Sequence, residues 1–258
     1  TELDNGISVS VMQDTSDNLG YGNSQIAFGN VGGLATIYVG SDSDPVDAID
    51  DITPSAYEEA NGSGSGTYSD IGTLAGQMGI GIKLDLPVLG ALNAKYYPKI
   101  DGTKNTDNTS SASANDNVGN GSSISLKTNL GDLPVLGGFL DGATLTSGYS
   151  THEEAVTANT DDAHELTAAL NYSIGAPSLG YQEKYNNAGQ TTEAGQTNFY
   201  RDTVIGAAYA VNDNLSISYA ERTVDIGGNT TDEEQSGISI GYSMGGMTIK
   251  AHNNVVDN

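Results

Sequence analysis

The sequence predicts an all-β protein: an antiparallel up-and-down sheet of about thirteen strands that forms a barrel. Three observations predict this class. Thirteen runs alternate apolar and polar residues, as half-buried strands do. The gaps between successive runs alternate between long and short along most of the chain. Glycine is frequent, with 34 copies in 258 residues, and helical periodicity is not sustained, so strands and turns are favoured over helices.

The strands follow one another along the whole chain. We place them at 7–12, 25–29, 34–40, 78–86, 91–97, 122–129, 143–149, 164–172, 179–185, 202–210, 215–222, 235–243 and 247–254. The long gaps are 13–24, 41–77, 98–121, 150–163, 186–201 and 223–234. Short turns, such as 30–33, 211–214 and 244–246, separate most of the other runs. Long loops at one rim and tight turns at the other are typical of bacterial outer-membrane barrels.

Residue parity assigns a face to each strand residue, because side chains alternate across a strand. One face is apolar in strand after strand. We expect it to point out of the barrel with Ile80, Ile82, Leu126, Leu166, Leu170, Ile217, Ile240, Ile249, Tyr96, Tyr149, Tyr172, Tyr181, Tyr209, Tyr219 and Tyr242. A soluble sandwich would alternate in the same way and bury this face, so alternation alone leaves both structures open.

The basic residues favour the membrane barrel. Six of the nine have the parity of the polar face, namely Lys83, Lys95, Lys127, Lys184, Arg222 and Lys250. A lysine or arginine pointing into lipid near the bilayer midplane costs about 2–4 kcal/mol, and this placement avoids that cost. The alternative is a set of solvated cations on a soluble sheet. On a barrel, these six side chains are the predicted basic wall of a pore.

The longest gap, 41–77, is the chief functional candidate. It contains eight acidic residues and no cation. A loop of this length inside a compact domain needs a physical reason, and folding into a wide lumen would supply one. We expect its carboxylates to face the basic wall across water and to form a constriction, with Asp42, Asp44, Asp47, Asp50, Asp51, Glu58 and Glu59. The alternative is a flexible acidic surface loop.

Composition excludes several other classes. The formal charge of −24 makes nucleic acid an improbable partner, because phosphate binding needs basic patches. Cysteine is absent, so there is no disulfide framework, and no apolar run is long enough for a membrane helix. The histidines, His152, His164 and His252, lack the spacing of a zinc site. No nucleophile elbow or phosphate loop is present, so we predict no enzyme.

Calcium is a separate hypothesis, and no cofactor is required. Asp42, Asp44, Asp50 and Asp51 could hold calcium loosely through oxygen ligands. The order of residues from Asp42 departs from an EF-hand loop, since Asp47 occupies the glycine position and Thr53 the glutamate position.

Three segments carry a family resemblance. They are ELDNGISV at 2–9, IAFGNVGGLATIYVG at 26–40 and YAVNDNLSISY at 209–219. They resemble Gram-negative general porins, and their character is closest to alphaproteobacterial porins. In organisation the resemblance covers nearly the whole chain, so residues 1–258 are expected to be one porin domain.

The resemblance implies a 16-stranded homotrimer in the outer membrane, in contact with lipid and lipopolysaccharide. It also implies a water-filled channel for passive diffusion of ions and small hydrophilic solutes, constricted by a long loop that corresponds here to 41–77. Thirteen runs would be strands three to fifteen, so the chain is expected to lack its first strands and its last strand. The rival functions are a secreted or cell-surface calcium-stabilised β-rich adhesin or surface-layer protein, and a soluble carbohydrate-binding sandwich.

Overall fold

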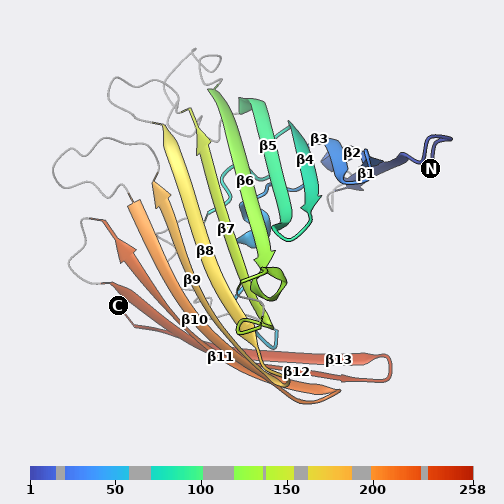
Figure 1. The fold of residues 1–258 in the computed structure, drawn as a ribbon. Helices are drawn as coiled ribbons and strands as arrows, with labels where there is room; N and C mark the ends of the chain where they lie inside the picture. Colours follow the sequence, from blue (N-terminus) through green and yellow to red (C-terminus); the bar gives the residue numbers. More distant parts are fainter. Residues whose placement is uncertain are drawn as a thin grey trace.

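The computed structural model describes residues 1–15, 21–57, 71–100, 119–135, 138–153, 162–187, 199–227 and 232–257. Its strands form a single 13-stranded antiparallel sheet in sequence order (Figure 1). They are β1 (Ser8–Thr15), β2 (Tyr21–Val31), β3 (Ala35–Gly40), β4 (Gly79–Leu86), β5 (Gly90–Ile100), β6 (Gly119–Asn129), β7 (Ala143–His152), β8 (Ala163–Ser173), β9 (Pro177–Asn187), β10 (Phe199–Asn212), β11 (Leu215–Ile226), β12 (Glu233–Met244) and β13 (Met247–Asp257).

The predicted fold class is confirmed, because each of the thirteen predicted runs is a strand paired with its neighbours in the sequence. The sheet is strongly curved, with β1 to β3 at one end and β12 and β13 at the other (Figure 1). In the described residues, two short 3₁₀ turns, η1 (Asp47–Ile49) and η3 (Leu130–Asp132), lie between strands. In the described part of the chain, no helix has the length and apolar character needed to cross a membrane.

The tight turns are set by local backbone chemistry. Between β2 and β3, Asn30, Gly32 and Gly33 have φ values of 58°, 62° and 82°. Glycine adopts this left-handed region without strain, and asparagine tolerates it better than most residues. The Asn30 Nδ2 also donates to the carbonyl oxygen of Gly6 at 2.9 Å. The sequence signal for a short turn here therefore corresponds to a backbone that requires those residues.

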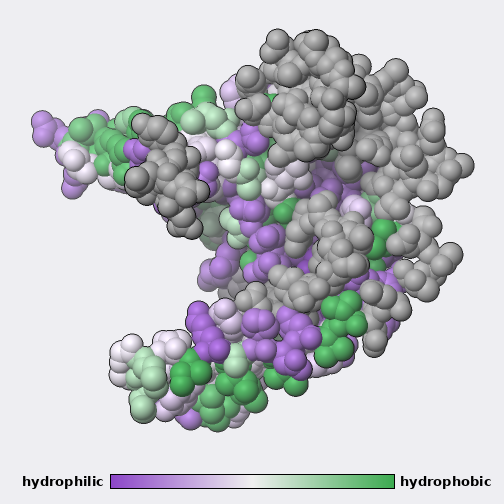
Figure 2. Space-filling model, turned by 180° about the vertical axis from the view of Figure 1, so that it is seen from behind, coloured by the Kyte–Doolittle hydropathy of each residue, from purple (hydrophilic) through white to green (hydrophobic). Residues whose placement is uncertain are grey.

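The two faces of the sheet differ in polarity as predicted. The outward face exposes large apolar side chains, including Ile80, Leu170, Ile205 and Ile249, each about half exposed. The concave face buries polar groups instead, among them Ser123, Glu165, Gln182 and Lys184. In Figure 2 the lower arm of the curve carries hydrophilic residues toward the hollow and hydrophobic residues on its outer side. The apolar face is therefore not the interior of a sandwich.

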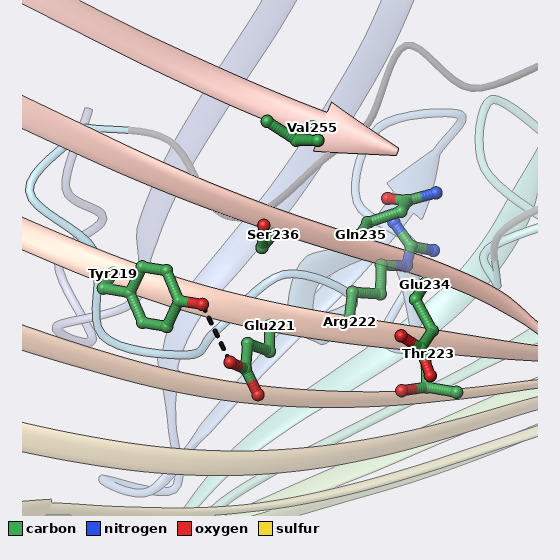
Figure 3. Close-up of a pocket in the computed structure, with 8 residues that line it drawn as sticks. All are labelled: Tyr219, Glu221, Arg222, Thr223, Glu234, Gln235, Ser236 and Val255. Carbon is green, nitrogen blue, oxygen red and sulfur yellow. Dashed lines mark hydrogen bonds between the residues drawn. The ribbon is translucent and has the colours of Figure 1, made fainter. Parts of the chain in front are cut away.

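The outward face becomes polar toward the long loops. The Tyr219 hydroxyl donates to Glu221 at 2.8 Å, and the Tyr181 hydroxyl donates to Glu183 at 3.4 Å. Figure 3 shows the first pair beside a pocket of about 270 Å³, lined by Tyr219, Glu221, Arg222, Thr223, Glu234, Gln235, Ser236 and Val255. Tyrosine suits such a boundary, because its ring is apolar and its hydroxyl is polar.

The assignment of faces predicts a contrast between two neighbouring residues of β11. In phospholipid, Ile217→Arg is expected to lower the free energy of unfolding by about 2–4 kcal/mol, the cost of a cation on the lipid-facing side. Ser216→Arg, on the concave face, is expected to change it little. Urea titration of the full-length protein in vesicles measures both. Equal losses for the two variants would contradict the assignment.

Candidate functional site

The segment after β3 follows the concave face of the sheet. Its described residues, 41–57, begin beside β2 and run across β6 and β7 to β12. Figure 1 shows η1 inside the curve of the sheet, beside β6 and β7. Residues 71–77 lead from this segment back to β4. We call residues 41–57 and 71–77 together the inner loop, and this loop with the wall it contacts is the candidate site. Polar contacts hold the loop at several points along this path, and Val46, Ile71 and Leu74 are buried apolar residues of it.

Asp44 attaches the start of the inner loop to the wall. Its side chain is buried, and Oδ1 accepts from the amides of Val46 and Asp47 at 2.8 and 2.9 Å and from Ser123 Oγ at 3.3 Å. Oδ2 accepts from the hydroxyl of Tyr97 on β5. A buried carboxylate is costly unless such hydrogen bonds satisfy it. Asp44 therefore joins η1 to two strands of the wall.

Further along, amide side chains of the wall hold the loop backbone. Gln182 Nε2 donates to the carbonyl oxygens of Ile49 and Asp50 at 2.8 and 2.6 Å, while its Oε1 accepts from the amide of Ile52 at 3.2 Å. Asn171 Nδ2 donates to the Ile52 carbonyl oxygen at 2.7 Å. An amide side chain suits this role, because it both donates to carbonyls and accepts from amides.

Wall hydroxyls hold the last described residues of this segment. The amide of Ala56 donates to Ser218 Oγ at 2.9 Å, and the amide of Tyr57 donates to Ser239 Oγ at 3.2 Å. The Tyr57 ring also lies beside β13, with Lys250 Nζ 4.5 Å from its centroid. Side chains of the wall from β6 to β12 thus bind backbone groups at several points along the inner loop.

Glycines of the wall make this close approach possible. A methyl group at Gly148 would lie 2.7 Å from Ile49 Cδ1, and one at Gly180 would lie 2.2 Å from Pro54 Cδ. At Gly241 it would lie 2.8 Å from the Ala56 carbonyl oxygen. Any larger side chain at these positions would push the inner loop off the wall.

The returning segment is held by a carboxylate of the wall. Glu165 on β8 is buried and accepts from the amides of Gly72 and Thr73 at 3.0 and 3.1 Å. It also accepts from the Thr73 hydroxyl and, at 2.7 Å, from Ser150 Oγ. Leu74 then packs against Tyr97 and Ile100 in a small buried apolar cluster. Glu165 and Asp44 are therefore matching attachments, one on the wall and one on the loop.

The six predicted wall cations divide into two groups. Lys95, Lys184 and Arg222 are buried in contact with the loop or the wall. Lys95 Nζ donates to the carbonyl oxygens of Asp42 and Ser43 at 3.1 and 3.4 Å. Lys184 Nζ lies 3.3 Å from Asp51 Oδ1 and 3.5 Å from Asp202 Oδ2, and Arg222 also pairs with Asp202. The expected separation from the loop by open water is wrong for Lys95 and Lys184, because both contact the loop directly.

The second group remains exposed on the concave face. It consists of Lys83, Lys127 and Lys250, all toward the tight-turn end of their strands. Lys83 Nζ lies 5.3 Å from the ring centroid of Tyr38, an arrangement like that of Lys250 over Tyr57. The exposed cations of the concave face therefore lie on the turn side of the inner loop.

The predicted acidic residues are placed as follows. Asp42, Asp47, Asp50 and Asp51 lie on the inner loop and are half-buried or exposed, whereas Asp44 is buried. Glu58 and Glu59 lie outside the described residues. Within the described ranges, no group of three or more histidine, aspartate or glutamate side chains is arranged to hold a metal ion. Asp44 moreover accepts hydrogen bonds on both oxygens, and the calcium hypothesis stays a prediction.

Sequence reasoning missed the residues that attach the loop. Glu165, Gln182 and the concave-face glycines all have polar-face parity, but parity says only that they face inward. A signal did exist at Glu165, since an acidic residue on the polar face of a central strand is unusual beside serine and threonine. Its partners, Gly72 and Thr73, lie 93 and 92 residues away, so the pairing itself could not be deduced.

Comparison with known proteins gives matches in structure only. No protein-family model and no curated protein sequence matches the chain. A porin structure refined at 1.8 Å is similar at a TM-score of 0.62 and 13% identity, over 100% of this chain and 84% of that one. The outer-membrane expressed OmpT of Vibrio cholerae gives 0.65 and 11%, over 99% and 76%. A mutant of the Rh. blastica porin gives 0.57 and 17%, over 98% and 81%.

These likenesses show the fold. The chain has the porin-type fold, an all-β transmembrane barrel of up-and-down antiparallel strands.

The attachment at Glu165 predicts a local change in protection. Glu165→Gln places an NH₂ donor against amide and hydroxyl donors, so the amides of Gly72 and Thr73 lose a charged acceptor worth about 1.5–3 kcal/mol. Hydrogen exchange in the peptide 71–77 is expected to accelerate at least about tenfold. Glu153→Gln is the control, because Glu153 also accepts from one backbone amide, that of Asn120 at 3.3 Å, but is exposed. Unchanged exchange in the Glu165 variant would contradict the attachment.

Proposed function

We propose that the protein is an outer-membrane porin that forms a water-filled channel for passive diffusion of ions and small hydrophilic solutes. One observation carries the proposal: the sheet exposes apolar side chains outward while its concave face is polar and holds the inner loop. A surface of this kind is stable only if lipid covers the outside and water fills part of the inside. The structural likeness to porins supports the same function.

The exposed apolar band disfavours the rival functions. A secreted adhesin or a soluble carbohydrate-binding sandwich would have to bury residues such as Ile80, Leu179 and Ile205, which are each more than half exposed. A contiguous apolar surface of this extent needs lipid or another protein to cover it. The proposal involves no chemical step on a solute, so it assigns no enzymatic activity.

The inner loop is proposed to constrict the channel. Its described carboxylates are Asp42, Asp44, Asp47, Asp50 and Asp51, and Asp51 retains 43% exposure although it pairs with Lys184. Lys184 pairs with Asp51 and Asp202, Arg222 pairs with Asp202, and Lys95 is buried against loop carbonyl oxygens. Exposed loop carboxylates are therefore proposed to dominate the local potential beside the loop. Rings of charge bias ion selectivity. We therefore propose weak cation selectivity at the loop.

The proposal extends to the oligomeric state and to the membrane around the protein. Following the resemblance to general porins, the protein is proposed to form a homotrimer in contact with outer-membrane lipid and lipopolysaccharide. Light scattering of the full-length protein in mild detergent tests the stoichiometry, and a monomer would count against the trimer.

Selectivity is the direct test of the channel. The reversal potential of the full-length protein in planar bilayers under a salt gradient is expected to show cation preference. The triple variant Asp47→Asn, Asp50→Asn, Asp51→Asn is expected to shift it toward anions. The shift should shrink with salt, since the Debye length falls from about 10 Å at 0.1 M to about 3 Å at 1 M.

A matched control removes the same charge elsewhere. Asp4→Asn, Asp132→Asn, Asp141→Asn changes three exposed carboxylates outside the inner loop and is expected to leave the reversal potential nearly unchanged. If both triple variants behave alike, the loop does not set selectivity. If the intact protein gives no channels, the proposed function itself is wrong.

A further inference from the structure

A second hollow lies on the turn side of the inner loop. It is a pocket of about 630 Å³ that reaches from Ala56 of the loop to the tight turns before β9 and β11. Its polar lining includes Asp213 of the β10–β11 turn and the concave-face residues Ser216, Ser243, Thr248 and Lys250. The pocket is therefore built from two distant parts of the sequence, the inner loop and the β8–β13 wall.

The inner loop closes this pocket toward the long-loop rim. The amides of Ala56 and Tyr57 are bound to Ser218 and Ser239, one concave-face position above the pocket on β11 and β12. The next positions toward the turns are Ser216 and Gly241, and both line it. A solute that passes the loop would meet the pocket next, and a solute from the turn side would meet it first.

Lys250 supplies the positive charge of the pocket. Among the described residues, its ammonium makes a contact over the Tyr57 ring at 4.5 Å and no ion pair with a carboxylate. A cation over an aromatic face keeps donors directed away from the ring. Lys184 and Arg222, by contrast, form ion pairs, Lys184 with Asp51 and Asp202 and Arg222 with Asp202. Lys250 is thus an exposed cation in the lumen, and its ammonium can donate hydrogen bonds to a solute.

The rest of the lining offers hydroxyl groups. Ser243 Oγ and Thr248 Oγ1 lie 3.3 Å apart beside Lys250, and Ser216 lies on the next strand. The neighbouring turn is fixed by Asn212 Oδ1, which accepts from the amides of Asn214 and Leu215 at 2.9 and 3.1 Å. One free cation beside several hydroxyls matches a solute that carries one carboxylate and several hydroxyls.

We propose that this pocket is a solute subsite for small polyhydroxylated carboxylates of the sugar-acid class. The Lys250 ammonium donates to the carboxylate of the solute, and Ser216, Ser243 and Thr248 exchange hydrogen bonds with its hydroxyls. Asp213 accepts from a hydroxyl at the far side and repels a second negative charge. This subsite rests on the proposed channel function, since only a channel delivers solute to it.

The test uses the full-length protein in planar bilayers with gluconate as the probe. Gluconate added on the turn side is expected to interrupt the current in a saturable manner, at lower concentration than on the long-loop side. Glucose, which lacks the carboxylate, and acetate, which lacks the hydroxyls, are each expected to need at least about tenfold higher concentration. Equal interruption by glucose or by acetate would overturn the assigned solute class.

Two lysine variants locate the subsite. Lys250→Gln is expected to weaken gluconate interruption at least about tenfold, whereas Lys83→Gln is expected to leave it unchanged. Lys83 is a close control, because it too is an exposed concave-face lysine over a tyrosine ring, at 5.3 Å. Equal effects of the two variants would overturn the assignment to this pocket.

A second variant and the conductance of the intact channel distinguish failure of the subsite from failure of the proposed function. If Lys250→Gln does not insert into bilayers, Thr248→Val is expected to weaken gluconate interruption about threefold, and an unchanged value would overturn the subsite. Intact channels that conduct salt without any gluconate interruption would overturn the subsite but leave the proposed function standing. Absence of channels would instead reject the proposed function.

Discussion

The attachment of the inner loop to the concave wall is the constraint on which the rest of this structure depends. A sheet that turns its apolar face outward leaves little apolar surface inside to hold a loop. Among the described residues, the buried apolar cluster at the loop consists of Leu74, Tyr97 and Ile100. Hydrogen bonds must therefore hold the loop in place, as hydrophobic packing holds segments together in a soluble protein. Each net bond contributes only about 0.5–1.5 kcal/mol, but a bond left unmade at a buried group costs more.

This constraint explains why the concave wall is both polar and rich in glycine. Asp44 and Glu165 each accept several hydrogen bonds, so the loop is bound from both sides of the contact. Where the loop crosses the wall, Gly148, Gly180 and Gly241 have no side chain, so the loop can lie close to the strands. The same crossing covers Lys95 and Lys184, and leaves Lys83, Lys127 and Lys250 exposed on the turn side. The position of the loop therefore also determines which basic side chains remain exposed along the lumen.

The sequence predicts the sheet far better than it predicts the site. Strand alternation and loop rhythm depend on local pattern, so all thirteen strands and the outward set, from Ile80 to Ile249, could be read directly. The attachments are not local, since Gln182 meets Ile49 across 133 residues and Glu165 meets Gly72 across 93. Parity placed Lys184 and Arg222 on the correct face. It could not show that both would lie buried beside Asp202 and not face open water, because that depends on the path of the loop.

The most direct test of the account is a disulfide between the loop and the wall in the conducting protein. The chain has no cysteine, and Ser218 Oγ lies 2.9 Å from the Ala56 amide, so Ala56→Cys with Ser218→Cys places two thiols in reach. Ala56→Cys with Ser125→Cys, on distant β6, is the control. The account predicts a near-complete crosslink for the first pair in bilayers, none for the control, and a conductance that the crosslink leaves essentially unchanged. Absence of the crosslink, or its formation only with loss of most of the conductance, would contradict the account.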